Sequence, residues 1–478
     1  MEHRQMFING EWVNAISQKT YDVVNPANGE VVAKAAYGDK EDAAYAIQSA
    51  SDAFESWSKL TAKDRSQYLY NLYDLMLKEK ESIAELITLE MGKPLRESRG
   101  EVQLAAEYLL WNAEEAKRVY GEIVPASSSG KRIHVIKQPI GPVAAIIPWN
   151  FPVSMLTRKI GPALAAGCTV ILKPASKTPG SAVRLFELIE QVGIPKGVVN
   201  LVMGRSSSIG NECLQNQKIK KITFTGSTEI GKELLRGAAD QVKRVSMELG
   251  GHAPFIVFED ADLNKAAEGA LVSKYRNAGQ TCICLNRLYV HRSVKEKFET
   301  ILKQKIESLK VGNGFDETTD VGPLVDQSAL EKVEQHVEDA VKKGAKVLIG
   351  GKRVEVNLAG HFYEPTLLSD VTEDMMITYD ETFGPVAPIY VFDNEDEVCK
   401  AANNTNYGLA AYFYTKNLGR TIRVSEKLDY GIIGINDAVP TTVQAPFGGM
   451  KESGVGREGG HQGVEEFFET KFLSIDVE

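Results

Sequence analysis

A cysteine, a glutamate and an asparagine of this sequence stand where predicted strands and helices end. Cys282 follows Gly-Gln-Thr at 279–281, and the glycine breaks the helix predicted before it, so the cysteine lies on a loop. Glu248 and Asn150 each stand at the end of a short apolar run. A thiol can act as a nucleophile, a carboxylate as a base and an amide as a donor to an oxyanion. Each also has a structural interpretation, since most lone cysteines are small buried side chains and Glu248 serves equally well as a surface carboxylate or helix cap.

The elements that must position these residues alternate between strand and helix. β-rich runs lie at 143–147, 169–172, 198–202, 222–225 and 245–249, and helical spacing separates them at 153–166, 181–191, 209–214 and 230–239. Alternation of this kind predicts a parallel, doubly wound sheet. Such sheets bind ligands at the carboxyl ends of their strands, where Asn150 and Glu248 are expected.

The flanking segments extend this α/β pattern. Helical periodicity fills most of residues 41–119, and a polar stretch at 127–130 interrupts the chain. After residue 251 we expect helices and strands of a second α/β domain: helices at 263–275 and 330–341, and strands at 288–291, 347–349, 389–392, 411–414 and 432–435. The last apolar run, 467–475, is interpreted as a strand added to a neighbour's sheet.

The composition carries no membrane, nucleic-acid or metal signature. The chain has 478 residues, 43% of them hydrophobic, which is enough for more than one core. The net charge of -9 and the absence of a basic run argue against a nucleic-acid partner. The N-terminus is polar and no segment approaches the roughly 20 apolar residues of a membrane span, so we expect neither a signal peptide nor a membrane helix. The five cysteines are odd in number and no Cys/His group has zinc spacing, which indicates a reducing cytoplasm and no metal site.

Two glycine-containing segments match nucleotide-binding motifs only in part. Residues 226–232 nearly spell a P-loop, but Glu233 stands where a magnesium-binding hydroxyl is needed. The helix that begins there still offers free amide donors to a pyrophosphate. Gly454, Gly456 and Gly459 have the spacing of a dinucleotide fingerprint without the βαβ unit it requires, so we interpret them as a loop that needs unusual backbone angles.

The chain resembles the aldehyde dehydrogenase superfamily over nearly its whole length. Seven short motifs occur in the family's order: Pro148-Trp149-Asn150-Phe151-Pro152, Lys173-Pro174-Ala175, Phe224-Thr225-Gly226-Ser227, Met247-Glu248-Leu249-Gly250-Gly251, Gly279-Gln280-Thr281-Cys282, Glu381-Thr382-Phe383-Gly384-Pro385 and Pro446-Phe447-Gly448-Gly449. The resemblance implies an NAD(P)-binding domain (1–119 and 141–251), a catalytic domain (252–445) and a small β oligomerisation arm (120–140 and 463–478). It also implies a homodimer or homotetramer.

The same resemblance assigns roles to single residues. Cys282 is the expected nucleophile, Asn150 and the Cys282 backbone N–H the expected oxyanion donors, and Glu248 the expected base for hydrolysis of a thioester. The expected cofactor contacts are Pro148, Trp149, Lys173, Ser176, Gly204, Gly226, Ser227, Leu249, Glu381 and Phe383.

Within the superfamily the sequence is most similar to succinate-semialdehyde dehydrogenases. Arg158 and Arg276 match the two arginines that hold the substrate carboxylate there, a task that suits a forked donor. A serine of that family is replaced in the loop that carries Thr441 and Thr442, and this departure leaves glutarate or 2-oxoglutarate semialdehyde as alternatives. A broad aldehyde dehydrogenase, with both arginines structural, is a further alternative. A non-catalytic protein and a phosphorylating dehydrogenase are disfavoured by Cys282 and Glu248.

Two finer expectations concern the cofactor and the second cysteine. Ser176 stands where NAD-specific relatives commonly carry a glutamate that repels a 2′-phosphate, and Lys173 and Lys177 add positive charge, so we expect NADP to be preferred over NAD. Cys284 forms a Cys-x-Cys pair with Cys282, as in some succinate-semialdehyde dehydrogenases that close it as a disulfide. A reversible redox switch and a small buried side chain are equally good interpretations of Cys284.

Overall fold

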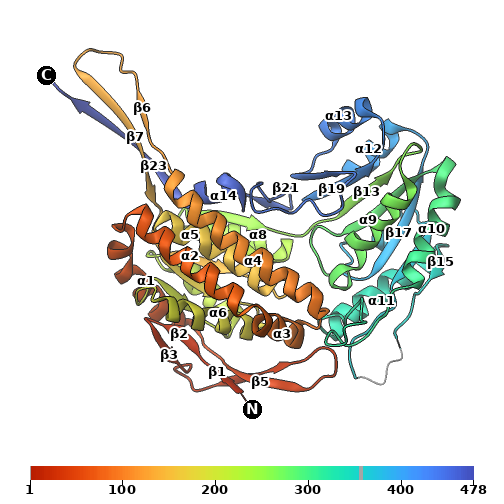
Figure 1. Ribbon diagram of the computed structural model, residues 1–478, viewed down its shortest axis with the longest axis horizontal. Helices are drawn as coiled ribbons and strands as arrows, with labels where there is room; N and C mark the ends of the chain where they lie inside the picture. Colours follow the sequence, from red (N-terminus) through yellow and green to blue (C-terminus); the bar gives the residue numbers. More distant parts are fainter. Residues whose placement is uncertain (1, 355–358) are drawn as a thin grey trace.

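Two α/β lobes and a projecting arm make up the molecule (Figure 1). A computed structural model of the chain describes residues 2–354 and 359–478. Each lobe is built around its own sheet and its own cluster of buried hydrophobic side chains, one mainly within residues 6–249 and the other within residues 253–447. The predicted α/β fold with more than one core is therefore confirmed.

The first lobe holds an eight-stranded sheet of order β22-β12-β11-β8-β9-β10-β2-β3. Its central strands are parallel: β8 (Val143–Ile146), β9 (Val170–Lys173), β10 (Val199–Leu201), β11 (Lys221–Thr225) and β12 (Arg244–Glu248). These are the five strands that the alternating pattern predicts. The pattern is readable because strands covered on both faces form nearly continuous apolar runs.

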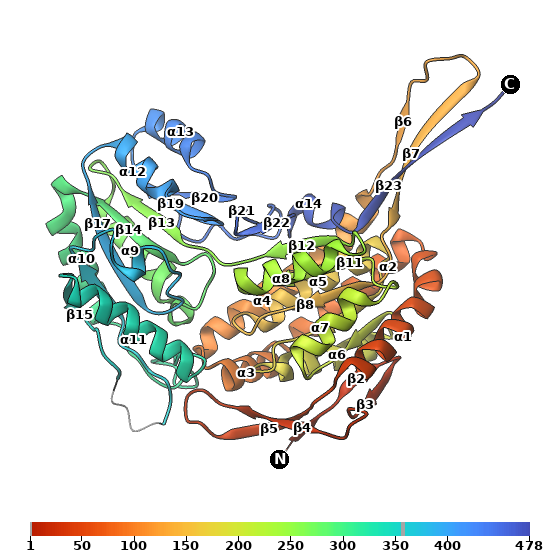
Figure 2. The ribbon, with the colours of Figure 1, turned by 180° about the vertical axis from the view of Figure 1, so that it is seen from behind.

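Helices cover both faces of this sheet (Figures 1 and 2). One layer contains α2 (Ala62–Lys78), α3 (Lys80–Met91), α4 (Leu95–Glu115), α5 (Pro152–Ala166) and α6 (Pro179–Val192). The opposite layer contains α1 (Lys40–Ser58), α7 (Ser206–Gln215) and α8 (Thr228–Ala239). Every residue of α5 is buried, which explains its apolar sequence and places the side chains of this helix inside the lobe.

Short strands that the sequence analysis did not predict complete the edges of the first lobe. β2 (Met6–Ile8) and β3 (Glu11–Val13) extend one edge, and β22 (Gly454–Val455) pairs with β12 at the other. β1 (Glu2–Arg4), β4 (Thr20–Val24) and β5 (Val31–Ala36) form a separate small sheet. Strands of two to six residues, several with exposed polar side chains, are too short to show a periodicity.

The second lobe holds a seven-stranded sheet of order β15-β16-β17-β14-β13-β19-β20. The strands are β13 (Ala253–Val257), β14 (Leu285–His291), β15 (Lys346–Ile349), β16 (Thr366–Ser369), β17 (Val386–Phe392), β19 (Ala410–Tyr414) and β20 (Ile432–Ile435). The helices are α9 (Leu263–Tyr275), α10 (Lys295–Glu307), α11 (Gln327–Lys342), α12 (Glu395–Asn403) and α13 (Leu418–Lys427). The strands are parallel apart from β15 at one edge, in agreement with the predicted second α/β region.

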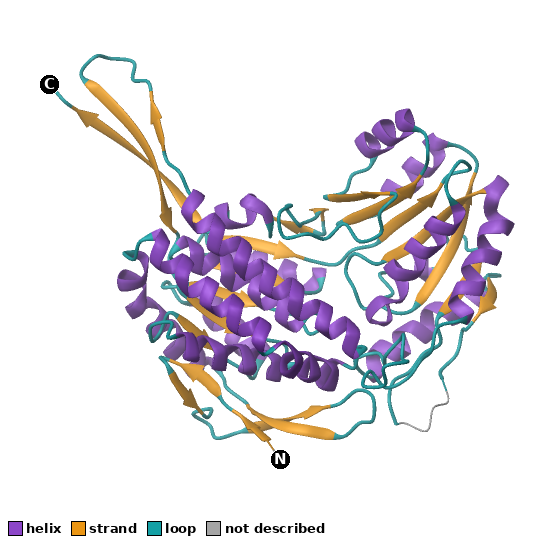
Figure 3. Ribbon diagram, viewed as in Figure 1, coloured by secondary structure: helices purple, strands orange, loops and turns teal. Residues whose placement is uncertain are grey.

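The arm is a three-stranded antiparallel sheet that projects from the first lobe (Figure 3). β7 (Lys131–Pro139) lies between β6 (Glu122–Val124) and β23 (Phe468–Asp476). The predicted C-terminal strand therefore pairs with β7 of its own chain. Ile123 is 80% exposed and Phe472 61% exposed, so the arm presents apolar side chains on its surface.

The remaining elements are short. β18 (Tyr407–Gly408) pairs with β21 (Met450–Lys451), and α14 (Gly460–Glu465) precedes β23. Single 3-10 turns cover Ala116–Arg118, Arg276–Gly279, Arg292–Val294 and Met376–Thr378. Among the described residues, no helix is both long and apolar enough to cross a membrane.

Candidate active site

Two cavities meet at Cys282, which lines both. The first, here called the strand-end cavity, measures about 450 Å³ and lies between the carboxyl ends of β8, β11 and β12 and residues 325–332 and 381–383 of the second lobe. The other, here called the helix cavity, measures about 260 Å³ and is bounded by α4, α5 and the turn at 276–283. Cys282 therefore stands where a ligand in one cavity can meet a ligand in the other.

The loop that carries Cys282 has a strained and tightly held backbone. Asn277 and Ala278 both have a φ of 53°, a left-handed conformation that is uncommon outside glycine. The Asn277 side chain donates to the carbonyls of Asn150 and Gln280, both at 3.1 Å. The Gln280 side chain accepts from the Val325 N–H at 2.9 Å. Both side chains are buried, and neither residue was predicted to have a role, although Gln280 lies within the motif that ends at Cys282.

Burial controls the charge of Cys282 and Glu248. It raises the pKa of the Cys282 thiol to about 12, against the opposing effect of the Arg158 cation. Burial also raises the pKa of the Glu248 carboxyl well above its ordinary range, and the nearby Glu458 carboxylate raises it further. The resting site therefore favours a neutral thiol and a neutral acid. Chemistry here requires a proton to leave when ligands bind.

Glu248 occupies the position that the strand pattern predicts. It is the last residue of β12 and only 3% of its surface is exposed. Its Oε2 has no hydrogen-bond partner among the described residues, so the carboxyl group has an unused acceptor. A buried carboxylate with a free oxygen is suited to take a proton from one water molecule.

A buried ion pair, which the sequence analysis did not predict, holds the backbone of Asn150 in place. The Lys93 ammonium donates to the Asn150 carbonyl at 2.6 Å and to Glu101 at 2.7 Å. Glu101 in turn accepts the backbone N–H groups of Val153 and Ser154 in the first turn of α5. The Asn150 side-chain amide donates to the Gln280 carbonyl at 3.0 Å, which leaves its second N–H for another acceptor.

Seven of the ten expected cofactor contacts line the strand-end cavity. They are Pro148, Trp149, Gly226, Ser227, Leu249, Glu381 and Phe383. The Ser227 hydroxyl caps the N-terminus of α8 by accepting from the Ile230 N–H. Glu381 accepts from the Gly251 N–H at 3.1 Å, and burial raises its pKa to about 7. The N-terminus of α8 and the Glu381 carboxyl therefore both line this cavity.

The other three expected cofactor residues lie outside the lining of that cavity. The buried Lys173 ammonium donates to the Ser206 hydroxyl at 2.6 Å, and burial lowers its pKa to about 8. Ser176 is half-buried near the Tyr21 hydroxyl. Gly204 has a φ of 130° and lies so close to Gly38 that a Cβ would meet the Gly38 carbonyl oxygen at 2.2 Å. Ser206 joins this group without having been predicted.

Lys177 does not point freely to solvent. It forms an ion pair with Asp326 of the second lobe, and its ammonium lies 5.6 Å from the centroid of the Trp149 ring. Lys177 and Asp326 both line the strand-end cavity, so the pair bridges the two lobes at its wall. Part of the positive charge expected here is therefore already balanced by a carboxylate.

The helix cavity collects three of the four expected substrate residues. Arg158, Arg276 and Thr441 line it together with Cys282. Thr442 is exposed, is absent from the lining, and donates its hydroxyl to Gln444. The arginines differ in their surroundings, since Arg276 is half-buried whereas the Arg158 side chain is 4% exposed.

Cys284 faces away from both cavities. Its thiol donates to the Gly279 carbonyl at 3.3 Å, and the buried Lys274 ammonium lies 3.6 Å from its sulfur. Neither cavity is lined by Cys284, although Cys282 two residues earlier lines both. A disulfide between the two cysteines requires the Cys284 side chain to leave these contacts.

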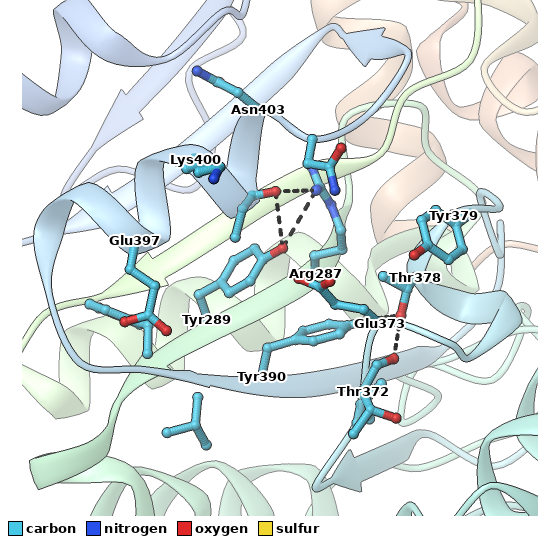
Figure 4. A pocket seen from close by; sticks show the side chains of 15 residues that line it. Arg287, Tyr289, Thr372, Glu373, Thr378, Tyr379, Tyr390, Glu397, Lys400 and Asn403 are labelled. Atoms are coloured by element: carbon cyan, nitrogen blue, oxygen red, sulfur yellow. Dashed lines mark hydrogen bonds between the residues drawn. The ribbon is translucent and has the colours of Figure 1, made fainter.

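A larger cavity of about 740 Å³ lies elsewhere in the second lobe, against β14, β17 and α12 (Figure 4). Its wall includes the buried Arg287, which donates to the carbonyls of His252, Ala401 and Ala402 and to the Tyr430 hydroxyl. These contacts occupy the guanidinium donors. No residue predicted to be functional lines this cavity, so we place the chemistry at Cys282.

Comparisons with known proteins give the chain its relatives. A model described as the aldehyde dehydrogenase family matches residues 12–473. A glutarate-semialdehyde dehydrogenase of Pseudomonas putida and a succinate-semialdehyde dehydrogenase [NADP(+)] of Escherichia coli are each 50% identical, over 99% of this chain and 98% of theirs. A crystal structure of an NADP dependent enzyme from E. coli has a TM-score of 0.98 and 50% identity, over 99% of this chain and 98% of that one.

Proposed function

This chain belongs to the aldehyde dehydrogenase family, and from that premise we propose that it oxidises succinate semialdehyde to succinate with NADP or NAD. The observation that carries the proposal is that Arg158 and Arg276 line one cavity together with Cys282. Two guanidinium groups beside a nucleophile suit a short aldehyde whose other end is a carboxylate.

The strand-end cavity fits a nicotinamide dinucleotide. The N-terminus of α8 at Gly226 and Ser227 offers amide donors to a pyrophosphate, and Glu381 lies where it can accept from ribose hydroxyls. The rings of Trp149 and Phe383, whose centroids lie 5.7 Å apart, line the same cavity. A cofactor bound in this cavity, which Cys282 also lines, would supply the hydride acceptor.

The protein's part in the first half of the reaction is nucleophilic attack and charge stabilisation. The Cys282 sulfur adds to the aldehyde carbon once its thiol has lost a proton. The free N–H of the Asn150 amide and the Cys282 backbone N–H receive the oxyanion that forms. Lys93 and Glu101 hold Asn150 for this task through its carbonyl and the start of α5. Once the adduct has given its hydride to the cofactor, a thioester would remain on Cys282.

The second half is hydrolysis of that thioester. Glu248, in its ionised form, takes a proton from water, and the resulting hydroxide attacks the acyl carbon. The acid product leaves and Cys282 is restored. The raised pKa of Glu248 makes its carboxylate a stronger base than an exposed glutamate once it is ionised.

Glutarate semialdehyde is the second candidate substrate. It is longer by one methylene, and a relative at 50% identity is named a glutarate-semialdehyde dehydrogenase. The cavity volume of about 260 Å³ accommodates either chain, and Thr441 is the hydroxyl-bearing residue of the 441–442 pair that faces it. A 2-oxoglutarate semialdehyde shares the same terminal carboxylate.

We infer that NADP is preferred and NAD is also used. Ser176 carries no charge to repel a 2′-phosphate, and Lys173 lies nearby at the end of β9. The E. coli relative is named for NADP(+). The Asp326 partner of Lys177 limits the contribution of that second lysine.

The proposal extends to domains and assembly. We assign residues 1–119 and 141–251 to cofactor binding and 252–445 to catalysis. Residues 120–140 and 463–478 are assigned to an arm that joins subunits into a homodimer or homotetramer. The exposed apolar side chains of the arm, Ile123 and Phe472 among them, support this assignment. The cysteines of the described chain are all free, which fits the cytoplasm.

A panel of aldehydes tests the substrate assignment. Initial rates with succinate semialdehyde, glutarate semialdehyde and butanal, each with NADP and with NAD, give kcat/KM for every pair. We expect both semialdehydes to exceed butanal by at least tenfold, with succinate semialdehyde the best. Equal values for butanal and succinate semialdehyde, which have the same chain length, would contradict the carboxylate site.

A further inference from the structure

The glycine-rich segment 454–460, which matches a dinucleotide motif only in its letters, presents a buried carboxylate at Glu458. The backbones of Glu458 and Phe447 exchange two hydrogen bonds of 2.6 and 2.8 Å, which fix the position of the glutamate. Gly456 and Gly459 on either side have φ values of 84° and 68°, a conformation that favours glycine. The glycines therefore shape the chain so that the Glu458 side chain, 6% exposed, lies against α5.

Glu458 forms a buried ion pair with Arg158 on the Nε side of the guanidinium. Its Oε2 lies 2.6 Å from Arg158 Nε, and its Oε1 contacts the Lys159 ammonium. The guanidinium carbon of Arg158 lies 4.2 Å from the centroid of the Phe447 ring. The Nε side and one face of the guanidinium are thus occupied by protein. One Nη group donates to the Met155 sulfur at 3.2 Å, and the other Nη N–H groups remain as the donors for a ligand in the helix cavity, which Arg158 lines.

We propose that Glu458 is a specificity-determining positioning residue that aims Arg158 at the carboxylate of the substrate. The inference rests on the proposed substrate-binding role of Arg158. A guanidinium recognises a carboxylate through directed, paired N–H donors, so its orientation decides how much it contributes.

The charges around Glu458 agree with this role. Two buried cations, Arg158 and Lys159, share this one carboxylate, and burial favours the neutral form of the neighbouring Glu248. Burial lowers the pKa of Lys159, whereas the Arg158 guanidinium stays charged, so the charge that an anionic substrate tail meets in the helix cavity is that of Arg158. Discrimination between an anionic and a neutral tail therefore depends on how Arg158 is held.

Two conservative substitutions separate the effect of the orientation of the Arg158 guanidinium from the effect of the charge on Glu458. Glu458→Asp keeps the charge but shortens the reach by one methylene, whereas Glu458→Gln keeps the reach and removes the charge. The measurement is the ratio of kcat/KM for succinate semialdehyde to that for butanal, in which effects common to both substrates cancel. We expect Glu458→Asp to lower the ratio at least fivefold and Glu458→Gln to leave it within threefold of the wild type. A similar fall in Glu458→Gln would mean that the charge of Glu458 matters and its reach does not, and would overturn the proposed positioning role.

A fall of less than fivefold in Glu458→Asp would overturn the inference, whatever Glu458→Gln does. Lys159→Met is the matched control, since it removes the other cation that contacts Glu458, and its ratio should stay within twofold. Arg158→Leu tests the premise. If Arg158→Leu leaves the ratio unchanged, the substrate role of Arg158 fails together with the inference. If Arg158→Leu lowers the ratio and Glu458→Asp does not, only the inference fails.

Discussion

Replacing Arg276 with leucine removes one of the two charges expected to hold the substrate carboxylate. Arg276 opens the turn that leads to Cys282 and lines the helix cavity, with its guanidinium carbon 5.6 Å from the centroid of the Phe151 ring. Leucine keeps an apolar contact with that ring but provides no donor. We expect kcat/KM to fall for aldehydes that carry a carboxylate and to stay almost unchanged for neutral ones.

The size of the effect follows from how the two arginines are placed. Truncating one partner of a buried, charge-assisted pair costs about 2–5 kcal/mol. Arg276 is half-buried and Arg158 remains in the variant, so the lower part of that range applies, about 2–3 kcal/mol. That free energy corresponds to a loss of roughly 30- to 150-fold in kcat/KM.

The assay compares succinate semialdehyde with butanal under identical conditions. Butanal should change less than threefold in Arg276→Leu. Arg276→Lys is the matched control, because it keeps the charge and loses the forked geometry, and it should give an intermediate loss. An equal fall for both aldehydes would refute the reasoning, since it would mean that Arg276 supports the Cys282 loop and not the substrate.

Further predictions concern the chemistry, the cofactor and the second cysteine. Cys282→Ala should bind cofactor in a fluorescence titration and form no acid, whereas Glu248→Gln should give a burst of reduced cofactor followed by slow turnover; normal steady-state rates in either variant would remove the assigned roles. Because burial raises the pKa of Glu248 and hydrolysis needs its ionised form, kcat should rise with pH around a midpoint well above the ordinary carboxyl range, and Glu248→Gln should lose this dependence. Ser176→Glu should shift preference from NADP toward NAD, and a wild type with no NADP turnover would contradict the cofactor assignment. Mild peroxide should inactivate the enzyme reversibly with loss of two hydrogens from the peptide that holds Cys282 and Cys284, and inactivation without that mass change would exclude the disulfide.

The sequence by itself determined most of the central elements of both lobes, although β13 and β16 of the second sheet were not predicted. The helix expected at 263–275 and the strand expected at 432–435 have the bounds that the structure shows. The ends of the five parallel strands of the first sheet lie within one residue of their predicted positions. These segments are buried on both faces or on one clear face, so their hydrophobic pattern is strong. The edge strands β2, β3 and β22 were not predicted, because two or three residues carry no periodicity and their pairing partners are distant in sequence.

The motifs likewise pointed to residues that the structure brings together. Cys282 lines both cavities, Glu248 ends β12, and Asn150 donates to the carbonyl of Gln280 just before the cysteine loop. Their residue types and their places at strand ends could be predicted from the sequence alone. Their grouping follows because parallel strands end at the same edge of a sheet.

Only the tertiary structure decided which groups these residues contact. Arg158 is paired with Glu458, 300 residues away in sequence, and Lys177 is paired with Asp326 of the other lobe. Thr441 lines the helix cavity while its neighbour Thr442 does not. The physical reason is that burial, ion pairing and side-chain direction depend on the three-dimensional neighbours of a residue, and local spacing does not record which distant segment supplies them.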